Sequence, residues 1–131
     1  MARLGRLTKR PEYLRVAGGG RKWATPGLVL QMRPRAAAEG DGDAEAVRLG
    51  ITVSRKVGGA VQRNRARRRL RAVAREALPE VGRPGHDYVL IGRAGTLTRS
   101  YAELCADLRT AVERLHRRPR PKAEAKSGAE A

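Results

Sequence analysis

An arginine-rich segment between positions 63 and 75 carries the most recognisable chemistry in this chain. Seven of its thirteen residues are arginine, and the first acidic residue after it is Glu76. Guanidinium groups stay charged and bind phosphate oxygens with two donors at once, whereas an ammonium group acts as a point charge. The alternative, that these arginines only face solvent, is disfavoured because like charges one turn apart destabilise a helix that has no anionic partner. The segment therefore predicts a binding site for a phosphate backbone.

The spacing of the apolar residues in this segment predicts that the arginines are displayed on a helix. Ala66, Leu70, Val73 and Ala77 recur at helical intervals and form one stripe. That stripe would pack on a core while the rest of the helix meets a polyanion. The arginines directly opposite the stripe are Arg68, Arg71 and Arg75, with Arg67 between them and Arg65 and Arg69 flanking the other side.

The residues before the helix are expected to join the same site. A Gly-Gly turn leads to Asn64, which is a good candidate for the N-cap of the helix. The exposed N–H groups and the positive dipole at a helix N-terminus would add to the charges of Arg55, Lys56 and Arg63. Loop and helix together would hold phosphate.

Composition points to a nucleic acid as the partner. The 131 residues suffice for one domain, and their net charge of +16 exceeds what solubility requires. No apolar run approaches the roughly 18 to 20 residues that span a bilayer, and no secretory signal is seen, so we expect a cytoplasmic protein without membrane contact. One cysteine and two histidines exclude an internal disulfide and a zinc-ligand set. Four scattered aromatic residues favour recognition of backbone and shape over base stacking.

The first half of the chain predicts an arm, a helix and a strand. Residues 1–10 are basic without a periodic apolar pattern and are interpreted as an arm that orders on RNA. Pro11 would begin a short helix that the glycines at 18–20 end. A strand is expected at 28–32, and the acidic, Gly-rich stretch 36–46 is interpreted as a hairpin connection.

The second half predicts two more strands and a closing helix. Residues 47–54 alternate as in a half-buried strand, the arginine helix ends near Pro79, and 88–92 form a continuous apolar run typical of a buried strand. Ser100 and Glu103 make a capping box for the last helix. Its apolar stripe begins at Tyr101, and Cys105 beside the stripe is expected to be a structural thiol. These elements predict a single α+β domain over 11–118, followed by a disordered tail at 119–131.

The stretch VSRKVGGAVQRNRARRRLR, residues 53–71, resembles the protein subunit of bacterial ribonuclease P, whose hallmark is VSKK-(V/I)-G-x-AV-x-RNR-x-(K/R)R-x-(L/I)R. Looser similarity extends upstream through RLTKRPEYLRVAGGG and downstream through HDYVLIGRAG, from Arg6 to the last predicted helix. The resemblance implies a mixed sheet of about four strands packed with three helices, similar to a ribosomal protein domain. It also implies a left-handed strand-helix-strand crossover.

The resemblance also implies a function that periodicity alone does not show. In this family a catalytic RNA subunit cleaves precursor tRNA to give the mature 5′ end, and the protein binds that RNA and the 5′ leader of the substrate. The implied partners are the catalytic RNA and precursor tRNA, with no protein partner. Mg²⁺ is implied to act through the RNA subunit, with no cofactor bound tightly by the protein and no catalytic or metal-binding residue in it.

Matching positions carry the family's two RNA-binding surfaces onto this chain. The surface toward the catalytic RNA is implied to contain Ser54, Arg55, Lys56, Arg63, Asn64, Arg65, Arg67, Arg68, Arg71 and Arg75. The cleft for the single-stranded leader is implied to contain Tyr13, Ala17, Val29 and Gln31. Ala17 and Gln31 stand where the family often has aromatic residues, which predicts weaker leader stacking. Arg69 stands where an apolar residue is frequent, which predicts a more exposed packing edge.

Two other functions compete with a ribozyme cofactor. A ribosomal or ribosome-assembly protein would have the same composition but would only scaffold RNA. An autonomous nuclease would need clustered carboxylates or a histidine pair, and Glu76, Glu80, Asp87 and His86 are scattered along the chain. The RNR motif preceded by VSRK favours the cofactor.

Overall fold

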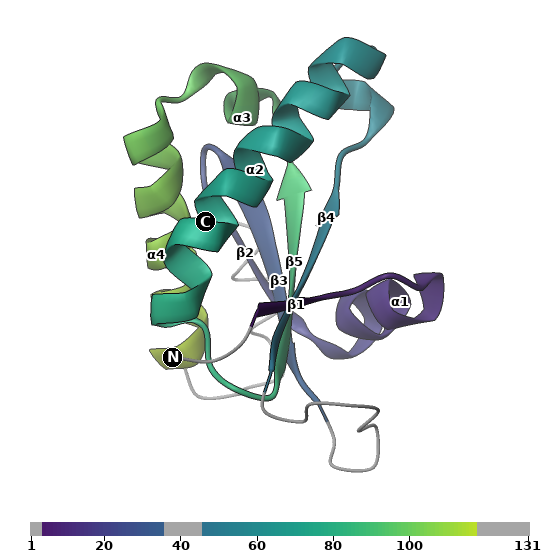
Figure 1. Ribbon diagram of the computed structural model, residues 1–131, viewed down its shortest axis with the longest axis vertical. Coiled ribbons are helices and arrows are strands. Elements are labelled where there is room, and N and C mark those ends of the chain that lie inside the picture. The colour runs from purple at the N-terminus through teal and green to yellow at the C-terminus, as the bar shows by residue number, and fades with distance from the viewer. Residues whose placement is uncertain (1–3, 36–45, 118–131) are drawn as a thin grey trace.

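The computed structural model describes residues 4–35 and 46–117, and in these ranges one mixed sheet carries helices on both faces (Figure 1). None of the helices in the described ranges is long and apolar enough to cross a membrane. The elements are, in chain order, β1 (Leu4–Arg6), α1 (Arg10–Gly19), β2 (Arg21–Ala24), β3 (Leu28–Pro34), β4 (Val47–Thr52), the 3₁₀ turn η2 (Arg55–Val57), α2 (Ala60–Val81), β5 (His86–Gly92), α3 (Ala94–Thr98) and α4 (Tyr101–Arg117).

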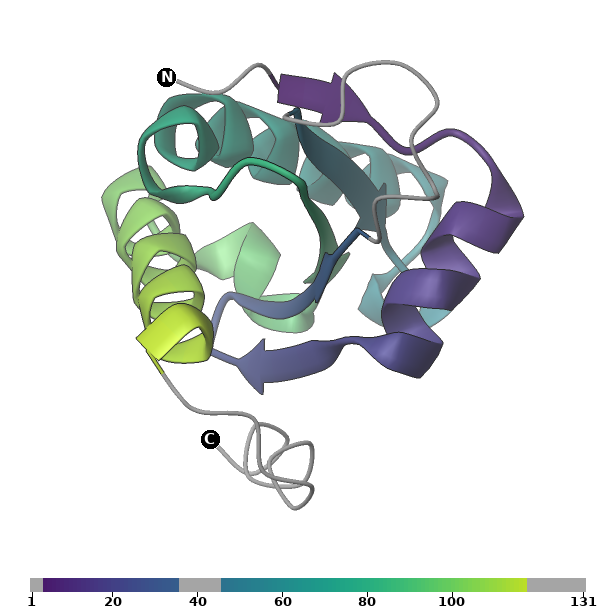
Figure 2. The same ribbon diagram turned by 90° about the horizontal axis from the view of Figure 1, so that it is seen from below.

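The strands lie in the order β1-β4-β5-β3-β2. β4 pairs in parallel with both β1 and β5, and β3 pairs antiparallel with β5 and β2. Seen from below, α2 and α4 cover one face of this sheet and α1 covers the other (Figure 2). The α+β class predicted from the sequence is confirmed.

The unit β4-α2-β5 joins two adjacent parallel strands through the arginine helix. In Figure 1 both strands run upward, α2 lies in front of them, and the chain moves from β4 on the right to β5 on the left. That path is a left-handed crossover, as the resemblance implied, although parallel crossovers are right-handed in nearly all folds.

The main core lies between the sheet and the pair α2 and α4. Alternate residues of β3 and β4, such as Leu30 and Val47, point into it, and β5 adds Tyr88 and Leu90. A smaller cluster on the opposite face joins Leu7, Val16 and Val89 under α1, with Tyr13 and Ile91 packed against it. The two clusters follow from the period of two along each strand, which sends successive side chains to opposite faces.

The predictions of four strands and of an N-terminal arm over residues 1–10 both fail at residues 4–6. Residues 4–6, expected in the arm, form β1 on the edge of β4, and Leu7 is buried with its N–H donating to the Leu49 carbonyl at 2.8 Å. The sequence of β2 shows no alternation of apolar and polar residues, so this strand was not predicted either. With β1 and β2 the sheet has five described strands instead of four. Residues 1–3 and the predicted tail at 119–131 lie outside the described residues.

The interpretation of 36–46 as a hairpin connection is also wrong. The strands that it would join, β3 and β4, are not neighbours, because β5 lies between them. β5 has four consecutive buried residues, from Asp87 to Leu90, and takes the central position where both of its faces are covered. Of this stretch only Ala46 lies within the described residues.

The closing helix α4 begins as predicted but packs differently at its first turn. The Ser100 N–H donates to the Glu103 carboxylate at 2.9 Å and the Glu103 N–H to the Ser100 hydroxyl at 3.1 Å, which confirms the capping box. Tyr101, predicted to lie on the apolar stripe, is instead 41% exposed, because its hydroxyl donates to Glu76 at 2.8 Å and the ring spans the surface between α4 and α2. Cys105 is buried beside it in the core, as expected of a structural thiol.

Candidate nucleic-acid interface

The arginine helix begins earlier than the sequence indicated. Gly59 is the N-cap, and Asn64, predicted for that role, lies in the second turn, where its side-chain oxygen accepts from Arg67 at 3.1 Å. The reason is the Gly-Gly turn: Gly58 has φ +155°, which favours glycine, and lets the chain enter the helix at once. The helix also continues to Val81 past Pro79, which removes only one hydrogen bond near the end.

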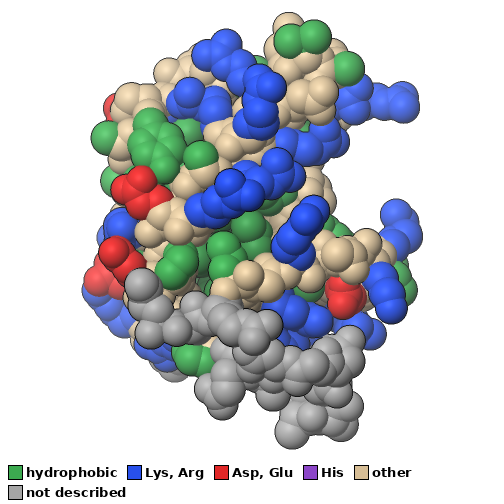
Figure 3. Space-filling model, viewed as in Figure 1, with side chains coloured by type: hydrophobic (Ala, Val, Ile, Leu, Met, Phe, Trp, Pro, Cys, Tyr) green, Lys and Arg blue, Asp and Glu red, His purple; other side chains and the backbone are tan. Residues whose placement is uncertain are grey.

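The predicted buried stripe of α2 is confirmed. Ala66, Leu70, Val73 and Ala77 are all fully buried in the described structure. The rest of the helix therefore faces outward, and its arginines have no carboxylate partner among the ion pairs of residues 4–35 and 46–117. Arginine side chains accordingly form a row on the surface along α2, up to Arg75 (Figure 3).

The approach to the helix provides further donors. Ser54 accepts at its hydroxyl from the Lys56 N–H at 3.3 Å and so shapes η2, which holds the exposed Arg55 and Lys56 just before α2. Among the residues that the structure describes, no side chain caps the first turn of α2. The N–H groups at that turn are therefore open to an anion close to the two cations.

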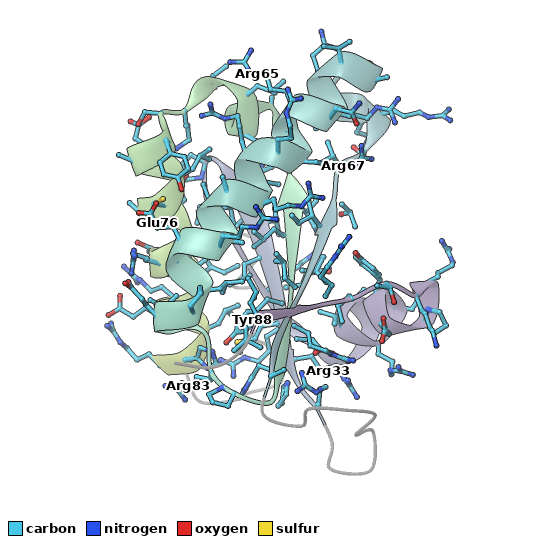
Figure 4. The ribbon with its side chains drawn as sticks, in the orientation of Figure 1. Arg33, Arg65, Arg67, Glu76, Arg83 and Tyr88 are labelled. Atoms are coloured by element: carbon cyan, nitrogen blue, oxygen red, sulfur yellow. The ribbon has the colours of Figure 1, made fainter. Side chains whose placement is uncertain are left out.

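The arginines of α2 divide between two directions. Arg65 and Arg68 are exposed on the outer surface, and Figure 4 shows Arg65 on the α3 side of the helix and Arg67 on the side of β4. Arg67, Arg71 and Arg75 recur every four residues and line one cleft together. The helical spacing predicted that Arg71 and Arg75 point in the same direction as Arg68. In the structure they instead lie with Arg67 on the side of α2 that faces the sheet.

That cleft is the hollow at the open side of β4, where α2, β1 and the start of α1 meet (Figure 3). Its volume is about 240 Å³, and no acidic residue is among the described residues that line it. Cations and apolar side chains there could hold a phosphate group beside a nucleoside. The lining residues are Leu4, Gly5, Arg6, Leu7, Tyr13, Leu49, Ile51, Arg67, Arg71 and Arg75.

The four residues implied for a leader cleft lie on α1 and on β3. Val29 and Gln31 pair with Ile91 and Val89 in the register of β3 and β5, and Val89 packs under α1. Both are partly exposed, Ala17 is exposed on α1 one turn after Tyr13, and Tyr13 also lines the arginine cleft. Tyr13 is thus the residue of these four that lines the same cleft as Arg67, Arg71 and Arg75.

Some residues of this cleft were not foreseen from the sequence. Arg6 belonged to the predicted arm, and a strand of three residues is too short to show alternation. The sequence predicted Leu49 and Ile51 only as part of a half-buried strand. These two residues line the cleft because β1 is short. Its pairing with β4 stops at Leu49, so Ile51 lies beyond the end of β1.

Arg69 has a structural role. Its Nε donates to the Thr96 carbonyl at 2.9 Å, and its Nη2 donates to the Arg99 carbonyl. These bonds attach α2 to α3, a short helix that the sequence did not predict. The packing edge expected to be more exposed is thus covered by a hydrogen-bonded guanidinium.

The acidic residues Glu76, Glu80 and Asp87 each have different partners, whereas the rings of His86 and His116 contact each other with their centroids 5.0 Å apart. Glu76 accepts from Tyr101, and this hydrogen bond raises the pKa of Tyr101 to about 12. Glu80 pairs with Arg109 at 2.8 Å, and Asp87 is buried between arginines. Among the described residues, no group of three or more His, Cys, Asp and Glu side chains could hold a metal ion.

His116 contacts the end of the core away from the arginine cleft. The Tyr88 hydroxyl accepts from the Arg83 N–H at 2.9 Å and shares a second hydrogen bond with Nε2 of His116, 2.6 Å away. Burial, together with the nearby positive charge of Arg83, lowers the pKa of His116 to about 4. The ring is consequently neutral near pH 7.

The sequence of this chain is similar to known proteins over most of its length. The sequence profile of the family described as Ribonuclease P matches residues 1–116. The ribonuclease P protein component of Paramagnetospirillum magneticum is 52% identical over 114 residues, covering 87% of this chain and 84% of the relative. That of Ruegeria pomeroyi is 49% identical over 116 residues, covering 88% of each.

A solved structure agrees as well. The RNase P protein from Thermotoga maritima superposes with a TM-score of 0.66 at 25% identity, over 88% of this chain and 98% of that one. The sheet order, the arginine helix and the sequence matches lead to the same result: the chain belongs to the ribonuclease P protein family.

Proposed function

We propose that this chain acts as the protein subunit of a cytoplasmic ribonuclease P holoenzyme. Maturation of tRNA 5′ ends is the role of the family. In this proposal the RNA subunit performs the cleavage with its Mg²⁺ ions, and the protein binds that RNA and the 5′ leader of precursor tRNA.

The observation that carries the proposal is the division of the α2 arginines. Arg65 and Arg68 face outward, where a folded RNA can approach, while Arg67, Arg71 and Arg75 share a cleft with Tyr13. We assign the outer surface, together with Arg55 and Lys56, to the catalytic RNA. We assign the cleft to the single-stranded leader, because guanidiniums one helical turn apart can follow a phosphate backbone and an aromatic ring can stack on a base.

The contribution of such a protein is positioning and charge neutralisation. Arginines that neutralise phosphates lower the concentration of Mg²⁺ that a folded RNA requires. Holding the leader fixes the scissile bond relative to the ribozyme, which reduces the entropy cost of reaching the reactive geometry. Both effects predict that the protein matters most at low Mg²⁺.

The test is reconstitution with the ribonuclease P RNA of Paramagnetospirillum magneticum, precursor tRNA and low Mg²⁺. We expect the protein to accelerate cleavage at the mature 5′ end, and the protein without RNA to leave the substrate intact. An Arg65→Ala/Arg68→Ala variant should stimulate less, while Arg114→Ala/Arg117→Ala, which removes the same charge from α4, should stimulate normally. No stimulation by the wild-type chain would refute the proposal and favour a scaffolding protein.

A further inference from the structure

A buried ion network lies where α1 meets the sheet, and the RNA-binding surfaces do not use it. Asp87 is 1% exposed and accepts from Arg48 through both oxygens, Nε to Oδ1 at 2.8 Å and Nη2 to Oδ2 at 2.9 Å. Arg35 donates to the same carboxylate at 2.8 Å. The Glu12 carboxylate lies 3.3 Å from Nη1 of Arg48. Two carboxylates and two guanidiniums thus balance in charge.

The two arginines hold different parts of the fold. Arg35 also donates to the carbonyls of His86 and Ala46, at 3.2 and 2.8 Å, and these two bonds lie at the end of the sheet. Arg48 instead bridges from the sheet to a helix, because Asp87 is on β5 and Glu12 is on α1. Within residues 4–35 and 46–117, Arg48 therefore connects α1 to the strands, whereas the hydrogen bonds described for Arg35 go to Asp87, His86 and Ala46.

Glu12 is itself fixed within the first turn of α1. Its Oε1 accepts from the N–H groups of Thr8 at 2.8 Å and Lys9 at 2.9 Å, which leaves Oε2 for Arg48. Burial raises the pKa of Glu12, but these two N–H groups and the Arg48 guanidinium outweigh burial and hold the pKa below its ordinary value. The carboxylate is therefore charged at neutral pH and ties the beginning of α1 to Arg48.

The residue after Glu12 is Tyr13, the aromatic residue of the cleft. Its ring lies against Gly50, which is two positions after Arg48 and so on the same face of β4. Neighbouring residues of α1 thus contact neighbouring positions of one strand face, one through an ion pair and the other through its ring. A shift of α1 at Glu12 would move the ring of Tyr13 with it.

We propose that Arg48 is a positioning residue for leader recognition: by binding Asp87 and Glu12 together, it fixes α1 against β4 and so sets where Tyr13 stands in the arginine cleft. This inference rests on the proposed function. It predicts that loss of the Arg48 bridge lowers selectivity for a substrate with a leader, while a loss of stability alone would leave selectivity unchanged.

The experiment compares Arg48→Met with Arg35→Met in the reconstituted holoenzyme. Both variants remove one arginine from Asp87 and cost stability, but Arg35→Met keeps the bridge to Glu12. The readout is the ratio of Kd for mature tRNA to Kd for precursor tRNA. We expect Arg48→Met to reduce this ratio by about fivefold, equivalent to about 1 kcal/mol. Arg35→Met should keep the wild-type ratio.

A Glu12→Gln variant gives a second route if Arg48→Met does not fold. Glutamine can still accept from Thr8 and Lys9, and every ion pair within the sheet remains. We expect the same loss of ratio as in Arg48→Met, and no further loss in the double variant, because both changes break one connection. Affinity for the RNA subunit alone should stay constant in all variants.

The outcomes separate the inference from the proposed function. If the wild-type holoenzyme shows no preference for precursor tRNA, the assignment of the cleft to the leader is wrong. If the wild type shows the preference and both Arg48→Met and Glu12→Gln retain it, the positioning role is wrong. Equal losses in Arg48→Met and Arg35→Met would also overturn it, since they would indicate a structural effect only.

Discussion

The ring of Tyr13 lies directly on the backbone of Gly50: a β-carbon at position 50 would fall 2.6 Å from its Cε2 atom. Only glycine leaves room for this contact, because real Cβ atoms do not approach so closely. The Tyr13 hydroxyl also donates to the Leu7 carbonyl at 3.3 Å. The position of the ring therefore depends on the absence of a side chain on β4.

Gly50→Ala is expected to displace Tyr13. The added methyl group must push the ring aside, with a loss of unfolding free energy of about 1–3 kcal/mol for overpacking. Denaturant unfolding measures this loss. Gly18→Ala on α1 is the control, because nothing lies within 4 Å of a β-carbon there, and it should be neutral or stabilising. A Gly50→Ala protein of wild-type stability would contradict the close contact.

Tyr13→Ala should weaken binding of precursor tRNA to the holoenzyme more than binding of mature tRNA. The difference should be about 1 kcal/mol if the ring stacks on one leader base. Equilibrium binding with substrates that differ only in the leader measures it. Tyr101→Ala, which removes an exposed ring on the α4 side, should affect both substrates equally. Equal losses for Tyr13→Ala would remove this residue from the leader path.

The two directions of the α2 arginines predict different losses. Arg68→Ala should reduce affinity for the isolated RNA subunit and flatten the log-log salt dependence by about one unit for a lost phosphate contact. Arg71→Ala should act mainly on precursor tRNA binding by the holoenzyme. Arg117→Ala on α4 controls for the change in net charge. If Arg68→Ala and Arg71→Ala gave the same pattern, one surface would serve both RNAs.

His116 predicts a loss of stability in acid. Its pKa is about 4 in the folded protein and about 6.5 unfolded, so the unfolded state binds the proton first and stability falls as pH drops from about 6.5 to 4. The full shift corresponds to about 3 kcal/mol, and partial exposure of the ring reduces this to about 2 kcal/mol. The unfolding free energy of wild type minus that of His116→Gln should therefore fall by about 2 kcal/mol as the pH drops through this range. Parallel curves would show that His116 does not titrate on unfolding.

Periodic features of the sequence predicted the fold well. The stripe from Ala66 to Ala77 has the burial that its spacing indicated. In β4, Val47 and Leu49 are buried as the alternation predicted, but Ile51 is only partly buried and Gly50 is buried under Tyr13. The arginine surface could be predicted because residue type and helical period determine which side chains face outward. The Ser100–Glu103 box could be predicted because it is local.

Features that depend on distant residues could not be predicted. β1 exists because β4 offers a free edge, and Asp87 finds its two arginines only after β3, β4 and β5 assemble. The N-cap assignment of Asn64 failed because a glycine turn can start a helix without a capping side chain. The cleft of Arg67, Arg71 and Arg75 likewise required knowing which side of α2 borders the open edge of β4.

The buried position of Cys105 provides a built-in reporter of helix separation. The chain contains one cysteine, and it packs in the core near Glu76 of α2. Because Cys105 is 8% exposed, opening of α4 from α2 should speed its reaction with thiol reagents, and the labelling rate should report that opening. Ribozyme binding that tightens α2 onto the body would slow the modification, and this could be followed by mass spectrometry without an engineered label.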